Sequence, residues 1–450
     1  MRTIIVLLLL ALPSTASAAG VEIFRSSATH FAGPALAGDN VLVASYPPNH
    51  TIDILSTAPG NVVKRPLHVT APNSSPIFSA SGDTILARVN NESGASDLYR
   101  GPLAGPLTKL QSCGRESNLS FPAAPVIDAD LEAWSADQCV RDRIHMQLGT
   151  ITRTVDAGGY VYGLAAAGRY VAWTSNSTAR QLTVYDVQAG QTAYTVPIAP
   201  ADRLDVQSDG TVALTQPDLS ADRSACHGVP ARVTYFTLAE PVAHTVPVSS
   251  CFDVVKIAAN LIGFAQHLPS GGERLALTNL AGTEIQPVAR IDAEPATFPD
   301  FDYDGRHIAW TQVRCRDEVV LRRDVSDTSA EDPAVTCPVH VGRPILRRDG
   351  TLHVAVSCPK GCRPTLGAGQ QGIQIVSPHW LHVRSKDRHG NVRYSPFVRV
   401  DLRAGKRTVV RLPLTSHQRA LLRRRHSVSV RLKVLLQNVY LPRIARTAHG

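Results

Sequence analysis

The sequence predicts an all-β protein: a seven-bladed β-propeller at residues 20–336, then a small antiparallel β-sandwich at residues 337–450. Two observations lead to this prediction. The stretch AAGRYVAWTS at residues 166–175 returns almost unchanged as YDGRHIAWTQ at residues 303–312. Near residue 337 this repeat stops, and segments with strict alternation of apolar and polar residues begin. Repeats of about 40–50 residues are typical of propellers, and period-two alternation is typical of half-buried strands.

Residues 1–19 form a predicted signal peptide. Arg2 supplies a positive start, residues 4–12 are apolar, and Ala16-Ser17-Ala18 offers a cleavage site of small residues. The alternative, a retained membrane anchor, is disfavoured because the apolar run is too short to span a bilayer. We therefore expect a secreted, periplasmic or cell-surface-associated protein with no transmembrane segment.

The repeat occurs seven times, at anchor positions separated by 43, 47, 39, 41, 50 and 46 residues. A small residue precedes most anchors and would let neighbouring sheets approach, while a bulky anchor would fill the gap between them. The anchors are Ala44, Ala87, Trp134, Trp173, Leu214, Phe264 and Trp310, of which the last five are the expected structural blade anchors.

Each copy predicts four strands, most clearly the fourth, where strands are expected at 161–167, 170–175, 181–187 and 191–196. Two-residue turns such as Asp304-Gly305 would join the first strand to the second, because both positions tolerate a positive φ. The seventh copy lacks a fourth strand, whereas residues 21–27 belong to no complete copy. We expect this N-terminal segment to close the last blade and so remove an exposed sheet edge.

The repeated words resemble the repeat of TolB-type, WD40-like β-propellers, whose consensus reads S-x-D-G-x-x-I-A-F/W. The resemblance covers about residues 21–335 and is best in the fourth, fifth and seventh copies. It implies a propeller in a periplasmic or extracellular setting. TolB proteins dock protein partners, but their partner-binding positions have no counterpart that can be matched here.

The eight cysteines fit an oxidising compartment and form sequence-local couples. A zinc site is the competing interpretation, but no two cysteines have CxxC spacing and no histidines lie at a matching offset, so we expect disulfides and no metal or other cofactor. Five of the cysteines would fall on the propeller face opposite the Asp-Gly turns. The predicted couples are Cys113 with Cys139, Cys226 with Cys251, Cys315 with Cys337, and Cys358 with Cys362.

The C-terminal module differs in charge from the rest of the chain. Residues 341–450 carry 22 Lys and Arg against 3 Asp, a net +19, whereas the remainder carries a net −10. Alternating segments at 351–358 and 427–436 predict strands, and residues 415–426 predict a short helix. The module is similar to arginine-rich, immunoglobulin-like domains of exported bacterial proteins. Its charge would favour non-specific contact with polyanions, but no motif indicates specific nucleic-acid binding.

No motif names a reaction, and no catalytic residue is predicted. The chain lacks a G-x-S-x-G nucleophile elbow, which disfavours a serine hydrolase. The leading hypothesis is an exported, non-catalytic scaffold that binds an envelope protein or glycan through the disulfide-tied face, with the basic module as spacer or electrostatic anchor. The alternative is a propeller hydrolase or lyase that acts on a glycan or lactone at the central channel. Converging carboxylates in the channel would favour the enzyme, and a plugged apolar channel would favour binding.

Overall fold

In the computed structural model, every regular secondary-structure element of the described residues is a β-strand, and no helix in them is long and apolar enough to cross a membrane. The structure describes residues 20–26, 30–46, 51–58, 61–68, 76–90, 96–113, 123–135, 139–140, 142–176, 179–199, 203–217, 231–250, 254–267, 273–291, 301–314, 317–326, 331, 340–342, 345–347, 351–359, 364–370, 384–386, 392–394, 398–399, 402–413, 427–436, 439–440 and 444–449. The predicted signal peptide lies outside these ranges.

Strands β1 to β28 pair into seven four-stranded antiparallel sheets within the described ranges. The first sheet contains β2 (His30–Ala37), β3 (Asn40–Tyr46), β4 (Thr51–Ala58) and β5 (Asn61–His68). The second contains β6 (Ile77–Ser81), β7 (Thr84–Asn90), β8 (Ser96–Pro102) and β9 (Thr108–Cys113). The third contains β10 (Val126–Asp128), β11 (Leu131–Ser135), β12 (Arg143–Leu148) and β13 (Ile151–Asp156). The fourth contains β14 (Tyr160–Ala167), β15 (Tyr170–Asn176), β16 (Arg180–Asp186) and β17 (Gln191–Pro197). The fifth contains β18 (Leu204–Val206), β19 (Val212–Pro217), β20 (Ala231–Phe236) and β21 (His244–Ser250). The sixth contains β22 (Lys256–Ala258), β23 (Leu261–His267), β24 (Glu273–Asn279) and β25 (Ile285–Ile291). The last contains β26 (Phe301–Tyr303), β27 (His307–Arg314), β28 (Asp317–Asp324) and β1 (Val21–Ser26).

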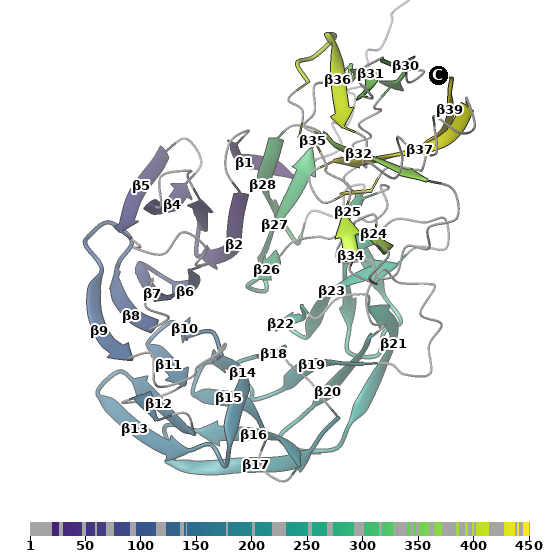
Figure 1. Ribbon diagram of the computed structural model, residues 1–450. Helices are drawn as coiled ribbons and strands as arrows, with labels where there is room; N and C mark the ends of the chain where they lie inside the picture. The colour runs from purple at the N-terminus through teal and green to yellow at the C-terminus, as the bar shows by residue number, and fades with distance from the viewer. Residues whose placement is uncertain are drawn as a thin grey trace, which may run out of the picture.

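The sheets follow one another around a ring, with the first strand of each innermost (Figure 1). Each innermost strand contacts that of the next sheet along the chain, from β2 through β6, β10, β14, β18 and β22 to β26. Strand β26 in turn contacts β2, which brings the first and last sheets together. The predicted β-propeller fold is confirmed.

The N-terminal strand closes the ring, as the sequence predicts. Strand β1 pairs antiparallel with β28, so that Val21 lies opposite Arg322 and Phe24 lies opposite Val320. The register shifts between Glu22 and Phe24. Ile23 and Phe24 pack against a buried cluster that the first and last sheets share. The chain therefore joins its own beginning to its last repeat both by backbone pairing and by apolar contact.

The turns between first and second strands keep a positive φ even in copies where the glycine is replaced. Gly168 and Gly305, in the two repeated words, have φ of 60° and 93°, which glycine adopts without strain. At the same turn the third and sixth copies place Ala129, with φ 48°, and Ala259 and Asn260, with φ 49° and 61°. These copies keep the turn geometry but not the glycine, so the motif is weaker there.

The anchor residues fill the space between consecutive sheets. Trp310, Phe264 and Leu214 have no exposed surface, and Trp173 is 2% exposed. Each packs in a cluster made with the preceding sheet, as Trp310 does with Leu275 and Leu277 of β24. Trp134 is less enclosed: it packs on the edge of a cluster containing Leu86, Leu98 and Ile127, and its ring stacks on His145 with 4.1 Å between centroids.

Beyond the propeller the chain forms further small antiparallel sheets. Strand β31 (Thr351–Ser357) pairs with β29 (His340–Val341), β30 (Ile345–Leu346) and β36 (Arg407–Pro413). Strand β37 (Ser427–Leu436) pairs with β32 (Pro364–Gln370), β38 (Val439–Tyr440) and β39 (Ile444–His449), and β32 also pairs with β35 (Val398–Arg399). A separate pair contains β33 (Arg384–Lys386) and β34 (Val392–Tyr394).

The alternation predicted at residues 351–358 is present, since Val354, Val356 and Cys358 are buried. Cys358 is disulfide-bonded. The helix expected at residues 415–426 lies outside the described residues.

Replacing Phe24 by alanine tests the ring closure. We expect Phe24→Ala to lower the free energy of unfolding by roughly 1–3 kcal/mol, because a partly buried side chain is lost from the seam between first and last sheets. Val21→Ala is the matched control on the same strand, because Val21 is 61% exposed. Chemical denaturation followed by circular dichroism measures both. If the two variants lower the free energy of unfolding equally, the side chain of Phe24 does not stabilise the contact between the first and last sheets.

A second comparison tests the anchors. Trp310→Ala should cost about 3–5 kcal/mol of unfolding free energy, because it empties a fully enclosed site between two sheets. Trp134→Ala should cost clearly less, since Trp134 lies at the edge of its cluster. The same denaturation experiment ranks them, and the reverse order would be incompatible with the packing described above.

Candidate functional site: the central channel

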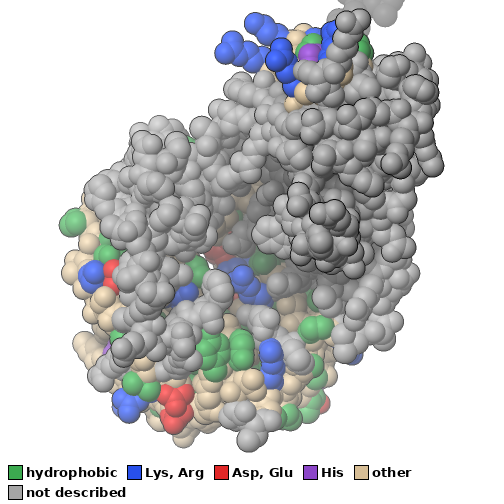
Figure 2. All heavy atoms as spheres, viewed as in Figure 1, with side chains coloured by type: hydrophobic (Ala, Val, Ile, Leu, Met, Phe, Trp, Pro, Cys, Tyr) green, Lys and Arg blue, Asp and Glu red, His purple; other side chains and the backbone are tan. Residues whose placement is uncertain are grey.

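The innermost strands of the seven sheets enclose a channel of about 720 Å³. A hollow is visible at the centre of the space-filling view, with basic and acidic side chains inside it (Figure 2). Among the described lining residues, five are aspartates and two are cations. They are Asp128, Asp205, Asp209, Asp302, Asp304, Arg203 and Lys256.

Three of these charges lie at the same level of the channel on consecutive sheets. Asp205 of β18 pairs with Ala213, Lys256 of β22 with Gly263, and Asp302 of β26 with Ala309. Each partner is the small residue that directly precedes an anchor. Equivalent register therefore places Asp205, Lys256 and Asp302 side by side around one half of the channel; we call them the charged arc.

The other half of the channel carries small, uncharged residues at this level. Ser79, Val126 and Ala165 occupy the equivalent positions of β6, β10 and β14, each opposite a residue that precedes an anchor. In β2 the register shifts between Ala32 and Ala35, which brings Gly33 and Pro34 to the channel. At this level the channel is therefore asymmetric, with charge on one wall and small side chains on the opposite wall.

The aspartates of the charged arc also bind the sheets together. The backbone amide of Leu36 donates to Asp302 Oδ2 at 2.7 Å, and the amide of Ile257 donates to Asp205 Oδ2 at 2.8 Å. Lys256 Nζ lies 2.8 Å from Asp302 Oδ1. Each carboxylate thus accepts a hydrogen bond from the innermost strand of the next sheet, while Asp302 also carries the ion pair with Lys256.

The pKa of Asp205 is raised to about 6. Loss of water around the carboxylate is the largest cause, and the negative charge of Asp302 adds to it. The positive charge of Lys256 and the backbone hydrogen bonds from Ile257 and Val206 act in the opposite direction and are outweighed. The charge of Asp205 is therefore poorly compensated by its surroundings.

Among the described lining residues, the two ends of the channel differ in charge. We call the propeller face with the turns between first and second strands the turn face, and the opposite face the loop face. Asp128, Asp209 and Asp304 line the channel at the turn face, where they accept backbone hydrogen bonds of 2.7–2.8 Å from Gly168, Thr211 and Arg306 respectively. Arg203, which directly precedes β18, lines the channel at the loop face and is exposed.

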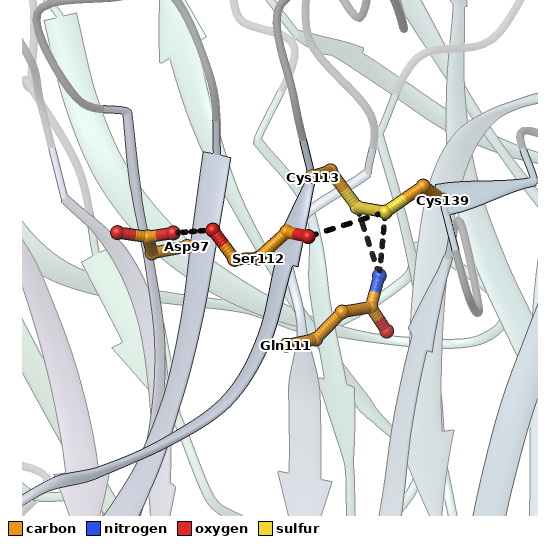
Figure 3. The surroundings of a disulfide bond; sticks show 5 residues. All are labelled: Asp97, Gln111, Ser112, Cys113 and Cys139. Carbon is orange, nitrogen blue, oxygen red and sulfur yellow. Dashed lines mark hydrogen bonds between the residues drawn. A yellow bond between two sulfur atoms is a disulfide. The ribbon is translucent and has the colours of Figure 1, made fainter.

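On the loop face, Cys113 and Cys139 form the predicted disulfide, with 5.4 Å between Cα atoms (Figure 3). It joins the end of β9 to the third sheet's loop between second and third strands. The side-chain amide of Gln111 donates to Cys113 Sγ at 3.0 Å. Cys226, Cys251, Cys315, Cys337 and Cys362 lie outside the described residues, so the other predicted couples stay predictions.

Asp97 holds the strand that leads to this disulfide. Burial favours the neutral form of its carboxyl, but hydrogen bonds from Ser112 at 2.5 Å, Lys109 at 3.0 Å and Tyr99 at 3.3 Å outweigh burial and lower its pKa. The interaction ties β8 to β9 next to Cys113 (Figure 3). Asp97 and Ser112 therefore support the disulfide rather than form a reactive site.

The sequence-predicted anchors do not contribute to the channel wall, since none of them lines it. The charged arc was missed by sequence reasoning because single Asp and Lys residues in short apolar strands carry no motif. Aligning the copies on their anchors and reading across to the first strand of each copy would have found it. Among the described residues, no three His, Cys, Asp or Glu side chains group as metal ligands.

No family model and no curated protein matches the sequence. Solved structures of similar shape include puromycin hydrolase, at 12% identity and TM-score 0.42, with 73% of this chain and 58% of that chain covered. The β-propeller domain of the Trilobed protease from Pyrococcus furiosus gives 10% identity and TM-score 0.45, covering 63% and 91%. BamB from Moraxella catarrhalis gives 13% identity and TM-score 0.36, covering 67% and 91%. The chain spans little more than half of puromycin hydrolase.

The raised pKa of Asp205 predicts a pH dependence of stability. The folded protein keeps this carboxyl protonated up to about pH 6, whereas an unfolded chain releases the proton at about pH 4. The folded state therefore binds more protons between these values, and the free energy of unfolding falls as pH rises through this window. Asp205→Asn should reduce this fall and make the protein more stable above pH 6, by at most about 3 kcal/mol.

Urea unfolding at intervals from pH 4 to pH 8 checks this expectation. Asp130→Asn, an exposed aspartate at the turn face, is the control. If Asp205→Asn leaves the slope of stability against pH unchanged, Asp205 does not have the environment described here.

Proposed function

We propose that this protein is an exported, non-catalytic β-propeller that binds an envelope protein or glycan, with the central channel as its recognition site. The observation that carries the proposal is the joint role of the channel aspartates. Asp128, Asp205 and Asp302 each accept a backbone hydrogen bond from the next sheet, so their carboxylates are held as part of the wall. Fixed, partly desolvated charges of this kind recognise a ligand without having to change position.

The export part of the proposal rests on the sequence of residues 1–19 and is supported by the Cys113–Cys139 disulfide, which is typical of an oxidising compartment. We further propose that residues 337–450 form an immunoglobulin-like sandwich that holds the propeller near anionic surfaces. The contacts of β36 with β32 and β35, and of β30 with β39, support a two-layer arrangement. The net charge of +19 at residues 341–450 supports attraction to polyanions.

One observation favours the enzyme as a second candidate. Asp205 and Asp302 converge on the channel, and the pKa of Asp205, at about 6, suits a general acid or base near neutral pH. Under this candidate, Asp205 would exchange a proton with a glycan or lactone, and Lys256 would stabilise developing negative charge. The commitment of Asp302 to Lys256 and to the Leu36 amide favours the binding function instead.

Binding to isolated envelopes distinguishes the two candidates. We expect the purified chain to bind envelopes saturably, with a component that persists at about 0.5 M salt and a component that is lost, because surface charges are screened over a few ångströms at that ionic strength. The persistent component should fall at least threefold in Asp205→Asn and remain in the control Asp130→Asn. The bound fraction is measured by sedimentation.

The same samples are assayed for released sugars and for opened lactones. The binding proposal expects no release above the level of a buffer blank. Release that is abolished by Asp205→Asn would overturn it in favour of the hydrolase. Retention that is wholly lost at high salt would also contradict it, because the basic module alone would then explain the association.

A further inference from the structure

The charge inside the channel has the opposite sign to that of the whole chain. The protein carries a formal net charge of +9, yet its described channel lining holds five aspartates against Arg203 and Lys256. Clefts lined by one sign of charge concentrate ligands of the other sign, because low-dielectric walls focus the field. The channel therefore favours a cation over an anion.

The charged arc has room for one more positive charge. It contains two carboxylates and one ammonium, and the ammonium of Lys256 lies against Asp302 at 2.8 Å. Loss of water is the largest cause of the raised pKa of Asp205, and the positive charge of Lys256 does not offset it. A carboxylate has about four lone-pair sites, so Asp205 can accept from a ligand in addition to the Ile257 amide.

The residues around Asp205 exclude other ligands. A divalent metal ion would lie next to the ammonium of Lys256, and metal ions prefer several oxygen ligands without a neighbouring cation. An anion would face the carboxylates of Asp205 and Asp302. A neutral sugar would bond with the carboxylates but would leave the excess negative charge uncompensated.

From this arrangement we infer that the channel binds the side chain of an arginine or lysine on a peptide segment of a protein partner, with Asp205 as the residue that pairs with its charge. A guanidinium is best suited, because its planar fork matches the two oxygens of a carboxylate. The small residues Ser79, Val126 and Ala165 on the opposite wall leave width for the side chain to reach Asp205. This inference deepens the proposed binding function and rests on it for its biological meaning.

The charges at the channel ends indicate the direction of entry. Asp128, Asp209 and Asp304 line the turn-face end, and Arg203 lines the loop-face end. Among the described lining residues, the charges at the first end attract a cationic side chain and the charge at the second end repels it. The peptide therefore docks on the turn face, opposite the disulfide-tied face that the sequence alone favoured.

The test measures binding of acetyl-Gly-Gly-Arg-Gly-Gly-amide to the full chain by calorimetry, against the same peptide with citrulline in place of arginine. Citrulline keeps the shape but has no charge. We expect at least tenfold weaker binding of the citrulline peptide, and at least tenfold weaker binding of the arginine peptide to Asp205→Asn. Asp130→Asn, on the same face but outside the channel lining, should change the affinity less than threefold.

Lys256→Gln supplies a readout that misfolding cannot imitate. Removing the ammonium leaves two carboxylates for the incoming cation, so the arginine peptide should bind several-fold tighter than it does to the parent chain. Circular dichroism confirms that each variant is folded. Tighter binding by Lys256→Gln together with weaker binding by Asp205→Asn supports the inference.

Equal affinity for the two peptides, equal effects of Asp205→Asn and Asp130→Asn, or no detectable binding of the arginine peptide each overturns the inference. These outcomes are separable from failure of the proposed function. If the protein binds envelopes but not the arginine peptide, the cationic-ligand inference is rejected, whereas the proposed envelope-binding function stands with a glycan as the ligand. Arginine-peptide binding without envelope retention keeps the channel site and rejects the envelope as the partner.

Discussion

The structure depends on closing a ring from sheets that, in the described part of the chain, share no strand pairing with one another. Neighbouring sheets are joined near the axis by aspartates that accept hydrogen bonds from backbone amides of the next sheet. Asp128 accepts from the amide of Gly168, Asp205 from that of Ile257, and Asp302 from that of Leu36. Ser79 Oγ accepts from Ile127 in the same way. Hydrogen bonds to a charged acceptor contribute more than those between neutral groups, so a few such bonds can fix the spacing of the innermost strands.

This requirement explains why the channel is charged at all. An apolar side chain in place of Asp302 would leave the Leu36 amide without this acceptor at the junction of the first and last sheets. The same carboxylates that satisfy these amides then face the channel, where their charge is available to a ligand. Asp205 and Asp302 therefore both join the sheets and present charge to a ligand. The ion pair between Lys256 and Asp302 reduces the free-energy cost of placing two carboxylates close together.

The apolar interfaces between sheets complement these polar bonds. Large anchors such as Trp310 and Phe264 are wholly enclosed, and the glycine before Phe264 is required because a Cβ there would lie 2.8 Å from the ring of Phe301. The disulfide from Cys113 to Cys139 adds a covalent tie at the periphery of the ring. Packing thus holds the sheets together along their length, while the hydrogen bonds near the axis set the geometry of the channel.

The sequence by itself determined the β-propeller, its repeated strands, the closure by residues 21–26 and the Cys113–Cys139 couple. Local signals carry these features: turn residues, period-two apolar patterns, and anchors at a regular spacing. Only the tertiary structure decided the candidate site. Asp205, Lys256 and Asp302 are separated by roughly one repeat each and have no local motif, so their proximity exists only once the ring closes. The sequence therefore pointed to the disulfide-tied loops, whereas the closed ring places the unbalanced charge at the axis.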